Sequence, residues 1–230
     1  MDVPIKNIRT LLTIFDTNNY VLNTRPYELN IVGVRSNSVI PNSFDDLIYV
    51  FWKDANGDWD GKYFSVTTDA GTFWLKSPMN KLGTSLLKQG QYKDAYAVGL
   101  HKGQYKALVQ VKPVTVILDY NRDAILDFNN GESKTGLFGI NIHQAGTSSE
   151  EVGKWSAGCQ VFQTQKDFNE FMKLVDKDRN LYGNSFTYTL IDERAYNRGF
   201  LKKSLYFVLG AIGVVAIYSG YKTYIGKKIF

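Results

Sequence analysis

Short runs of alternating apolar and polar residues, separated by turn-forming residues, dominate the chain before Glu193. Alternation with a period of two predicts strands that bury one face. Asn56-Gly57 predicts a type I′ hairpin turn, because both residues tolerate a positive φ. Strands are expected at residues 27–35, 46–52, 62–67, 90–92, 96–100, 107–118 and 186–191.

Two segments instead carry apolar residues at helical spacing. Residues 4–16 predict a docking helix, and residues 167–178 predict an amphipathic helix with a single apolar stripe. The whole pattern predicts a mainly β fold of antiparallel strands with a few helices. The expected domain covers residues 27–193 and follows a lead-in at residues 1–26.

The longest uncharged stretch of the chain covers residues 204–221. As a helix rising about 1.5 Å per residue it would extend about 27 Å, close to the hydrocarbon thickness of a bilayer. Lysines flank both ends, so a single-pass C-terminal transmembrane helix is expected, followed by a basic tail at residues 222–230. A buried core helix is the alternative. Ala216 and Gly220 have the spacing that favours helix contacts between protomers.

The charge distribution bears on the choice of partner. A formal net charge of +5 suggests nucleic acid, but all 22 acidic residues precede Arg198, while six of the 27 basic residues follow Asn197. The excess positive charge therefore flanks the apolar segment, and no nucleic-acid partner is expected. The apolar run at residues 11–15 is too short for a secretory leader, so none is expected.

The chain has a single cysteine, Cys159, so no intrachain disulfide can form. It ends a run of small residues, Ser156-Ala157-Gly158-Cys159, and apolar residues follow it. A thiol attacks carbonyl groups as a thiolate, and an imidazole such as that of His143 can accept its proton. Backbone N–H groups in a glycine-containing turn can stabilise the oxyanion that forms. The pattern indicates a nucleophile at a strand mouth; a small buried hydrophobe is the alternative.

These residues resemble the catalytic domain of L,D-transpeptidases of the YkuD type. That family carries a strand-borne His followed some sixteen residues later by Ser-x-Gly-Cys, and Cys159 follows His143 at this spacing. The family's upstream Gly-x-Phe/Tyr element resembles Gly90-Gln91-Tyr92. The resemblance implies an antiparallel β-sandwich over most of the soluble part.

The resemblance also implies roles for individual residues. Cys159 is the implied nucleophile and His143 the implied general base. The N–H groups of Gly158 and Cys159 would line an oxyanion hole in a loop that Ser156 helps to shape. The implied reaction is acylation of the cysteine by a peptidoglycan stem peptide, followed by attack of an amine or of water, and no cofactor takes part.

Five further positions qualify this interpretation. Val161 stands where many family members carry Arg, and Ala157 where a His is common, which leaves hydrolysis or an altered substrate open. His101 is either a structural histidine on a strand edge or a partner of the site near Tyr92. Trp155 is expected to pack against the loop; a platform for the stem peptide is the alternative.

Residues 119–127 place oxygen-bearing side chains at alternating positions, as calcium loops do. Ala124 and Asn130 occupy the positions where such a loop needs Gly and Glu, so a solvated acidic turn is expected, with calcium binding as the alternative. Two histidines and one cysteine cannot form a structural zinc site of nitrogen and sulfur ligands. No metal site is expected.

These features together predict a membrane-anchored cysteine enzyme that acts on peptidoglycan stem peptides. A C-terminal anchor without a leader leaves the domain on the cytosolic side, and a phage-encoded lysis enzyme or virion enzyme would reconcile that placement with a wall substrate. The anchor would then lie in a host cell membrane or a virion membrane. The alternative is an inactive structural protein of a membrane-containing virion or a cell envelope, with virion proteins as neighbours.

Overall fold

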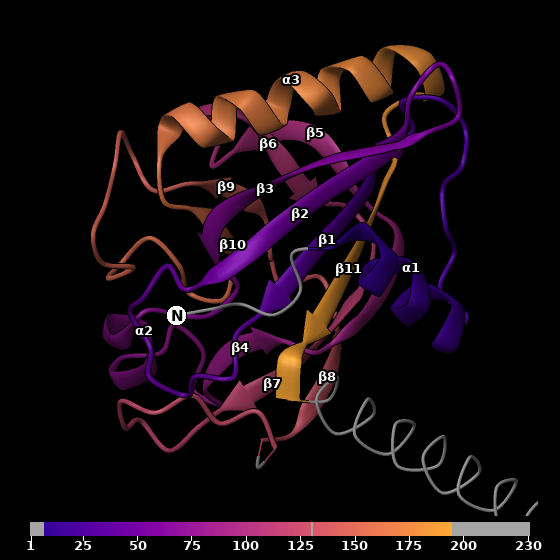
Figure 1. The fold of residues 1–230 in the computed structure, drawn as a ribbon. Coiled ribbons are helices and arrows are strands. Elements are labelled where there is room, and N and C mark those ends of the chain that lie inside the picture. Colours follow the sequence, from indigo (N-terminus) through magenta and orange to yellow (C-terminus); the bar gives the residue numbers. More distant parts are fainter. Residues whose placement is uncertain (1–6, 130, 195–230) are drawn as a thin grey trace, which may run out of the picture. The chain divides into compact units, whose positions relative to one another are not determined.

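Eight strands close into a barrel in this computed structural model, which describes residues 7–129 and 131–194 (Figure 1). Each strand is hydrogen-bonded to the next, so the barrel has no free edge. The fold is therefore mainly β, as the sequence predicts. In order around the barrel, the strands are β1 (Asn30–Arg35), β11 (Phe186–Asp192), β5 (Gly90–His101), β6 (Tyr105–Gln110), β9 (Ile142–Gln144), β10 (Gln160–Phe162), β3 (Trp59–Thr67) and β2 (Asp46–Lys53).

Helix α3 (Gln165–Tyr182) crosses one end of the barrel (Figure 1). Thr164 caps its N-terminus by accepting a hydrogen bond from the Asp167 backbone N–H, which satisfies one of the orphan donors there. The expected apolar stripe is buried, and its Phe168 and Phe171 rings lie 5.4 and 4.9 Å from the Phe162 ring. The helix predicted at residues 167–178 is confirmed with longer ends.

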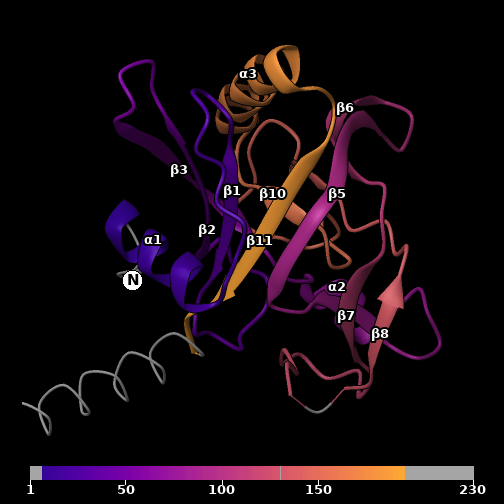
Figure 2. The ribbon, with the colours of Figure 1, turned by 90° about the vertical axis from the view of Figure 1, so that its right-hand side faces the viewer.

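The second sheet lies at the opposite end of the barrel from α3 in both views (Figure 2). It contains β4 (Thr84–Leu87), β7 (Val114–Asp119) and β8 (Ser133–Gly136), with the short helix α2 (Thr72–Lys76) beside it. Helix α1 (Ile8–Thr17) packs on the outside of the barrel, where the Phe15 ring meets Phe51 at 5.8 Å.

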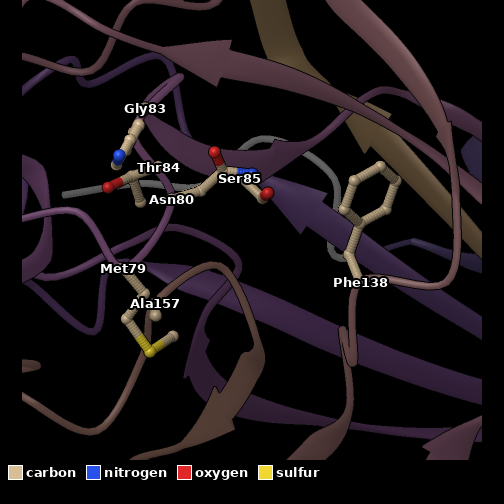
Figure 3. A pocket seen from close by; sticks show the side chains of 8 residues that line it. Met79, Asn80, Gly83, Thr84, Ser85, Phe138 and Ala157 are labelled. Atoms are coloured by element: carbon tan, nitrogen blue, oxygen red, sulfur yellow. The ribbon is translucent and has the colours of Figure 1, made fainter.

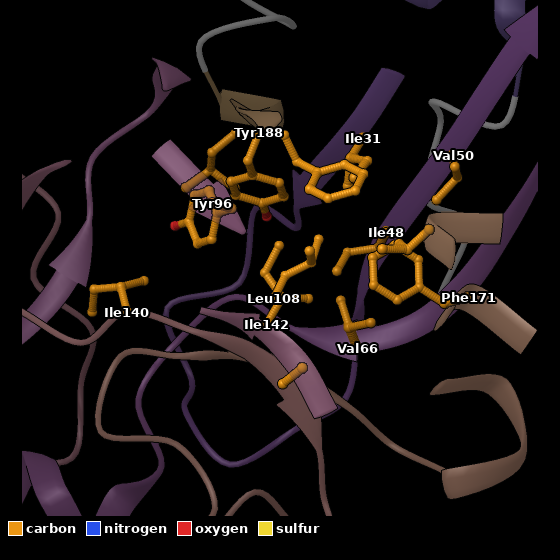
Figure 4. Packing of buried hydrophobic residues seen from close by; sticks show 14 of the residues in the cluster. Ile31, Ile48, Val50, Val66, Tyr96, Leu108, Ile140, Ile142, Phe171 and Tyr188 are labelled. Atoms are coloured by element: carbon orange, nitrogen blue, oxygen red, sulfur yellow. The ribbon is translucent and has the colours of Figure 1, made fainter. Parts of the chain in front are cut away.

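Aliphatic and aromatic side chains fill the barrel interior (Figure 4). Ile48, Val66 and Leu108 are fully buried, and each such side chain contributes roughly 1.5–3 kcal/mol to folding. Tyr96 and Tyr188 bring phenol groups into this core, with their rings edge to face at 5.7 Å. The core is therefore mainly apolar, and the hydroxyl groups of these two tyrosines are polar groups within it.

A buried arginine joins the barrel to the second sheet. Arg35, at the end of β1, forms an ion pair of 2.8 Å with Asp69 and donates a hydrogen bond of 3.0 Å to the Leu87 carbonyl at the end of β4. It also donates to the Thr68 carbonyl at 3.1 Å and lies over the Phe128 ring. Because a buried charge that loses its partner destabilises strongly, this contact fixes β4 against the barrel.

The expected antiparallel β-sandwich is wrong in two respects. The strands close into a barrel, and two of its pairs, β1–β11 and β9–β10, are parallel. Parallel neighbours need a long crossover connection. Residues 145–159 provide one between β9 and β10, and the other parallel pair joins the first and the last strand of the described chain.

Several local expectations also change. The turn at residues 54–58 is not type I′, because Gly57 alone has a positive φ there, +86°. The strand expected at residues 107–118 is two strands, which separate around Pro113, a residue without a backbone N–H to donate. The strands expected at residues 90–92 and 96–100 are the single strand β5. Strands β4 and β8 were not predicted.

The described residues from 7 to 192 belong to one compact unit. The segments expected as a transmembrane helix (204–221) and a basic tail (222–230) lie outside the described residues, as does the start of the helix expected at residues 4–16. Within 7–129 and 131–194, no helix has the length and apolar character needed to cross a bilayer.

Candidate active site

The strand register places Cys159 and His143 on one face of the barrel wall. Ile142 pairs with Gln160, and His143 pairs with Val161, so Cys159 lies beside Asn141. Side chains alternate between the two faces of a strand, so the thiol, the Asn141 amide and the imidazole share the face opposite the core residue Ile142. The thiol and the imidazole are thus one strand apart and offset by two residues.

The loop before Cys159 is held by Ser156. Its hydroxyl donates a hydrogen bond of 2.8 Å to the Cys159 carbonyl and accepts one of 3.1 Å from the Gly158 N–H. Gly158 has a φ of +119°, and a Cβ there would lie 2.0 Å from the Ser85 carbonyl oxygen of β4. Only glycine fits this position. The shaping role expected of Ser156 agrees with this geometry.

The oxyanion role implied for the Gly158 N–H does not agree with it. That N–H already donates to Ser156, within the same turn, and is not directed at a substrate. The reason is local: a Ser two residues before an amide readily closes such a turn. The Cys159 N–H remains the loop donor that an oxyanion would need.

Cys159 is partly buried and carries a free thiol. Its sulfur accepts a hydrogen bond from the Asn141 N–H at 3.5 Å and donates one to the Gly139 carbonyl at 3.4 Å. Burial raises the pKa of the thiol, and the Asn141 N–H opposes this only partly. The side chain is therefore a protonated thiol at neutral pH.

His143 is buried, and its hydrogen bonds define its tautomer. Nδ1 lies 3.0 Å from the Gln144 carbonyl oxygen and 3.4 Å from the Tyr105 hydroxyl. A carbonyl only accepts hydrogen bonds, so we assign the ring proton to Nδ1 and the lone pair to Nε2. Burial, with a smaller contribution from His101, lowers the pKa of this imidazole to about 3.

The thiol and the imidazole are not hydrogen-bonded to each other in this structure. The buried Nε2 of His143 has no hydrogen-bond partner among the described residues, and the Cys159 sulfur is engaged with Gly139 and Asn141. Catalytic hydrogen bonds are often long in the absence of substrate. The arrangement supplies an uncharged base and an uncharged nucleophile on one face.

His101 lies against His143 and not beside Tyr92 as considered from the sequence. The two imidazole rings stack with centroids 4.0 Å apart and an interplanar angle of 24°. The Asn141 side-chain amide is 3.1 Å from His101 Nδ1. Sequence reasoning missed Asn141, Tyr105 and Gln144; the two-residue spacing of Asn141 from His143 is the one signal that could have found a member of this group.

Tyr92 and Trp155 take no part in the contacts around the imidazole. The Tyr92 hydroxyl shares its proton between the Lys88 carbonyl and the Thr115 carbonyl, which is 3.1 Å away. Trp155 is 45% exposed. Its indole ring packs against Gly146, on the loop that leads to Cys159, so closely that a Cβ on this glycine would lie 3.1 Å from the ring. The expectation that Trp155 is packed therefore holds for only part of its surface.

A cleft of about 400 Å³ opens beside the cysteine loop (Figure 3). Ala157 of that loop and Ser85 of β4 line the cleft, and the third lining residue, Phe138, precedes Gly139, whose carbonyl contacts the thiol. The volume lies in the range of ligand sites. The remaining lining residues are Met79, Asn80, Lys81, Gly83 and Thr84.

Gln160 ties the cysteine loop to the barrel interior. Its amide nitrogen donates to the Gly158 carbonyl at 3.3 Å, and its oxygen accepts a hydrogen bond of 2.8 Å from Tyr188. Since Gln160 is fully buried, this link holds the loop in a single position.

No three His, Cys, Asp or Glu side chains lie close enough to hold a metal ion in the part of the chain that the structure describes. In the acidic turn at residues 119–127, the Asn121 side chain donates to Asp123 at 3.0 Å and to Asp127 at 2.6 Å. Burial raises the pKa of the Asp119 carboxyl to about 6. The turn is therefore closed by its own hydrogen bonds.

Comparison with known proteins gives no relative: no family model, curated protein or solved structure matches the chain.

Proposed function

We propose that this chain is a cysteine enzyme that acts on peptidoglycan stem peptides by acyl transfer through a Cys159 thioester. The observation that carries the proposal is the state of His143. Its Nδ1–H is held by the Gln144 carbonyl, while its Nε2 lone pair has no hydrogen-bond partner among the described residues and lies one strand from the only thiol of the chain. A general base needs a free lone pair close to the proton that it removes.

In the proposed reaction, the thiol turns from the Gly139 carbonyl toward His143, and Nε2 takes its proton. The sulfur forms a bond to the substrate carbonyl carbon, and the Cys159 N–H donates to the oxyanion. The amide C–N bond then breaks, and the imidazolium returns its proton to the leaving amine. Water or a second stem amine attacks the thioester and restores the thiol.

The cleft beside the loop is the proposed place for the acyl donor. It runs past Ala157 and Phe138, which lead to Cys159 and to Gly139, and the Ser85 hydroxyl can bind a peptide backbone. The Thr84 hydroxyl donates to the Trp74 carbonyl at 2.6 Å. The uncharged segment at residues 204–221 is the proposed membrane anchor. A phage lysis enzyme or virion enzyme is the setting that fits a wall substrate.

The test uses the full chain in detergent with purified sacculi. The wild type is expected to release or link muropeptides, seen by chromatography and mass spectrometry, and Cys159→Ala and His143→Gln are expected to abolish this. Turnover that survives Cys159→Ala contradicts the nucleophile. The matched control is Ser149→Ala. Ser149 lies on the same crossover, at residues 145–159, but its hydroxyl donates to the Glu151 carbonyl and not to a residue around Cys159 or His143.

A structural protein of a virion or cell envelope is the second candidate. The observation that favours it is the missing hydrogen bond between thiol and imidazole, together with a thiol pKa raised by burial. Under this candidate, the wild type shows no turnover on sacculi, and Cys159→Ala leaves assembly into particles or envelopes unchanged.

A further inference from the structure

His101 lies behind the proposed base, His143, and its contacts bear on how that base is held. Four groups meet around its ring: the Asn141 side chain at Nδ1, the His143 ring on its face, the Tyr105 ring at 5.6 Å, and Lys102 next in the chain. His101 is only 5% exposed. A buried, stacked histidine therefore lies directly on the proposed base.

We propose that Asn141 and His101 are positioning residues, which hold His143 as an uncharged imidazole with Nε2 free to take the thiol proton. This inference rests on the proposed function for its catalytic meaning. Its structural content, the proton positions on the two rings, can be measured without any substrate.

Hydrogen-bond direction gives the first step. The Gln110 backbone N–H donates to Asn141 Oδ1 at 2.9 Å, and a backbone N–H cannot reverse its role. The Asn141 NH₂ group must then be the group that faces His101 Nδ1 at 3.1 Å, and it only donates. His101 Nδ1 is therefore an acceptor, and the ring proton lies on Nε2.

The ring stack gives the second step. Two imidazoles 4.0 Å apart cannot both carry a positive charge without strong repulsion. A proton on His101 would make His143 a poorer base. The Asn141 NH₂ group opposes protonation at His101 Nδ1, and the adjacent Lys102 ammonium disfavours a second positive charge.

Asn141 also touches the nucleophile directly. Its backbone N–H donates to the Cys159 sulfur at 3.5 Å, and its carbonyl accepts from the Gln160 N–H at 2.9 Å. One residue thus sets the position of the thiol through its backbone and the state of the base through its side chain and His101.

The decisive substitution is Asn141→Asp. It keeps the shape and the Gln110 contact, but presents an acceptor to His101 Nδ1 in place of a donor. His101 is then expected to carry a proton on Nδ1. The matched control is Asn184→Asp, whose side chain exchanges hydrogen bonds with the Val98 backbone, three residues before His101 on β5.

The readout is long-range ¹H–¹⁵N NMR of the full chain in detergent, which reports the tautomer of each imidazole. The chain has two histidines, so His101→Gln assigns both ring systems. We expect Nδ1–H for His143 and Nε2–H for His101 at pH 7. We expect Asn141→Asp to move the His101 proton to Nδ1 and to raise its titration midpoint, and Asn184→Asp to change neither ring.

A wild-type His101 already in the Nδ1–H form overturns the inference, as does an Asn141→Asp spectrum identical to the wild type. In the sacculus assay, Asn141→Asp is expected to lower kcat about tenfold or more with KM within twofold, and to lose more activity at pH 6 than at pH 8. An inactive wild type with the expected spectra contradicts the enzyme proposal alone, so the two failures are distinguishable.

Discussion

At the scale of single residues, burial keeps the Cys159 thiol and the His143 imidazole uncharged. It raises the pKa of the Cys159 thiol and lowers that of the His143 imidazole to about 3. A preformed thiolate–imidazolium pair would need the opposite shifts. The proposed mechanism is therefore one of general-base catalysis, in which the proton moves during attack.

The single cysteine makes this state measurable. With a pKa raised by burial, the thiol is expected to react slowly with iodoacetamide at pH 7, and its rate should keep climbing with pH beyond the point at which the rate of the unfolded chain levels off. The unfolded chain in urea is the control, with an ordinary thiol pKa. A fast, pH-independent rate between pH 6 and 8 would show a thiolate and contradict the uncharged pair.

Gly158 carries the second prediction at this scale. Gly158→Ala combines a positive φ with a Cβ 2.0 Å from the Ser85 oxygen, so it is expected to cost more than about 3 kcal/mol in free energy of unfolding. Gly183→Ala, at φ +98° with open space around it, carries the backbone cost alone, about 1–3 kcal/mol. Equal losses in urea titrations would mean that β4 does not press on the loop.

At the scale of secondary-structure elements, the parallel pair β9–β10 brings Cys159 and His143 together. Because the two strands run in the same direction, residues at their N-terminal ends lie side by side, and Asn141 meets Cys159. The crossover at residues 145–159 also brings Gly158 against Ser85 of β4. In an antiparallel pair, the thiol and the imidazole would lie at opposite ends of the register.

Helix α3 is joined to the segment before β1 through the buried carboxyl group of Asp178. Asp178 accepts a hydrogen bond of 2.8 Å from the Leu29 N–H, and burial, with Glu28 nearby, raises the pKa of its carboxyl to about 6. A raised acid pKa means that the folded state binds the proton more tightly, so this group destabilises the fold as pH rises through about 6.

Asp178→Asn keeps an acceptor for the Leu29 N–H without the charge. We expect it to raise the free energy of unfolding by about 2 kcal/mol at pH 8 and by about half of that at pH 5. The partly exposed Asp176→Asn on the same helix is the control. A gain that is the same at both pH values would contradict the burial of a charged carboxylate.

Long periodic segments could be predicted from the sequence, and short or non-local features could not. Strands β1, β2 and β11 and helix α3 carry enough alternating or helical residues to be recognised. Strands β9 and β10 have three residues each, too few for periodicity to specify. Motif spacing singled out Cys159 and His143 as candidates, but the stack of His101 on His143 depends on the register of three strands, β5, β6 and β9.

At the scale of the whole molecule, the uncharged segment at residues 204–221 follows the barrel domain in the sequence and is the proposed membrane anchor. We expect the full chain to bind liposomes and to resist carbonate extraction. The double substitution Val214→Asp and Val215→Asp, near the middle of residues 204–221, is expected to abolish this, because each charge at a bilayer centre costs about 3 kcal/mol. Binding that survives both charges would place the attachment elsewhere.

Formation of a covalent acyl–Cys159 intermediate is the most direct test of the proposed chemistry. The full chain is mixed with a peptidoglycan stem peptide, quenched in acid and weighed by intact-mass spectrometry. We expect a mass increase equal to the acyl portion of the donor, mapped to Cys159, absent in Cys159→Ala and strongly reduced in His143→Gln. A wild type that never gains this mass, or an adduct that persists without Cys159, contradicts catalysis by this thiol.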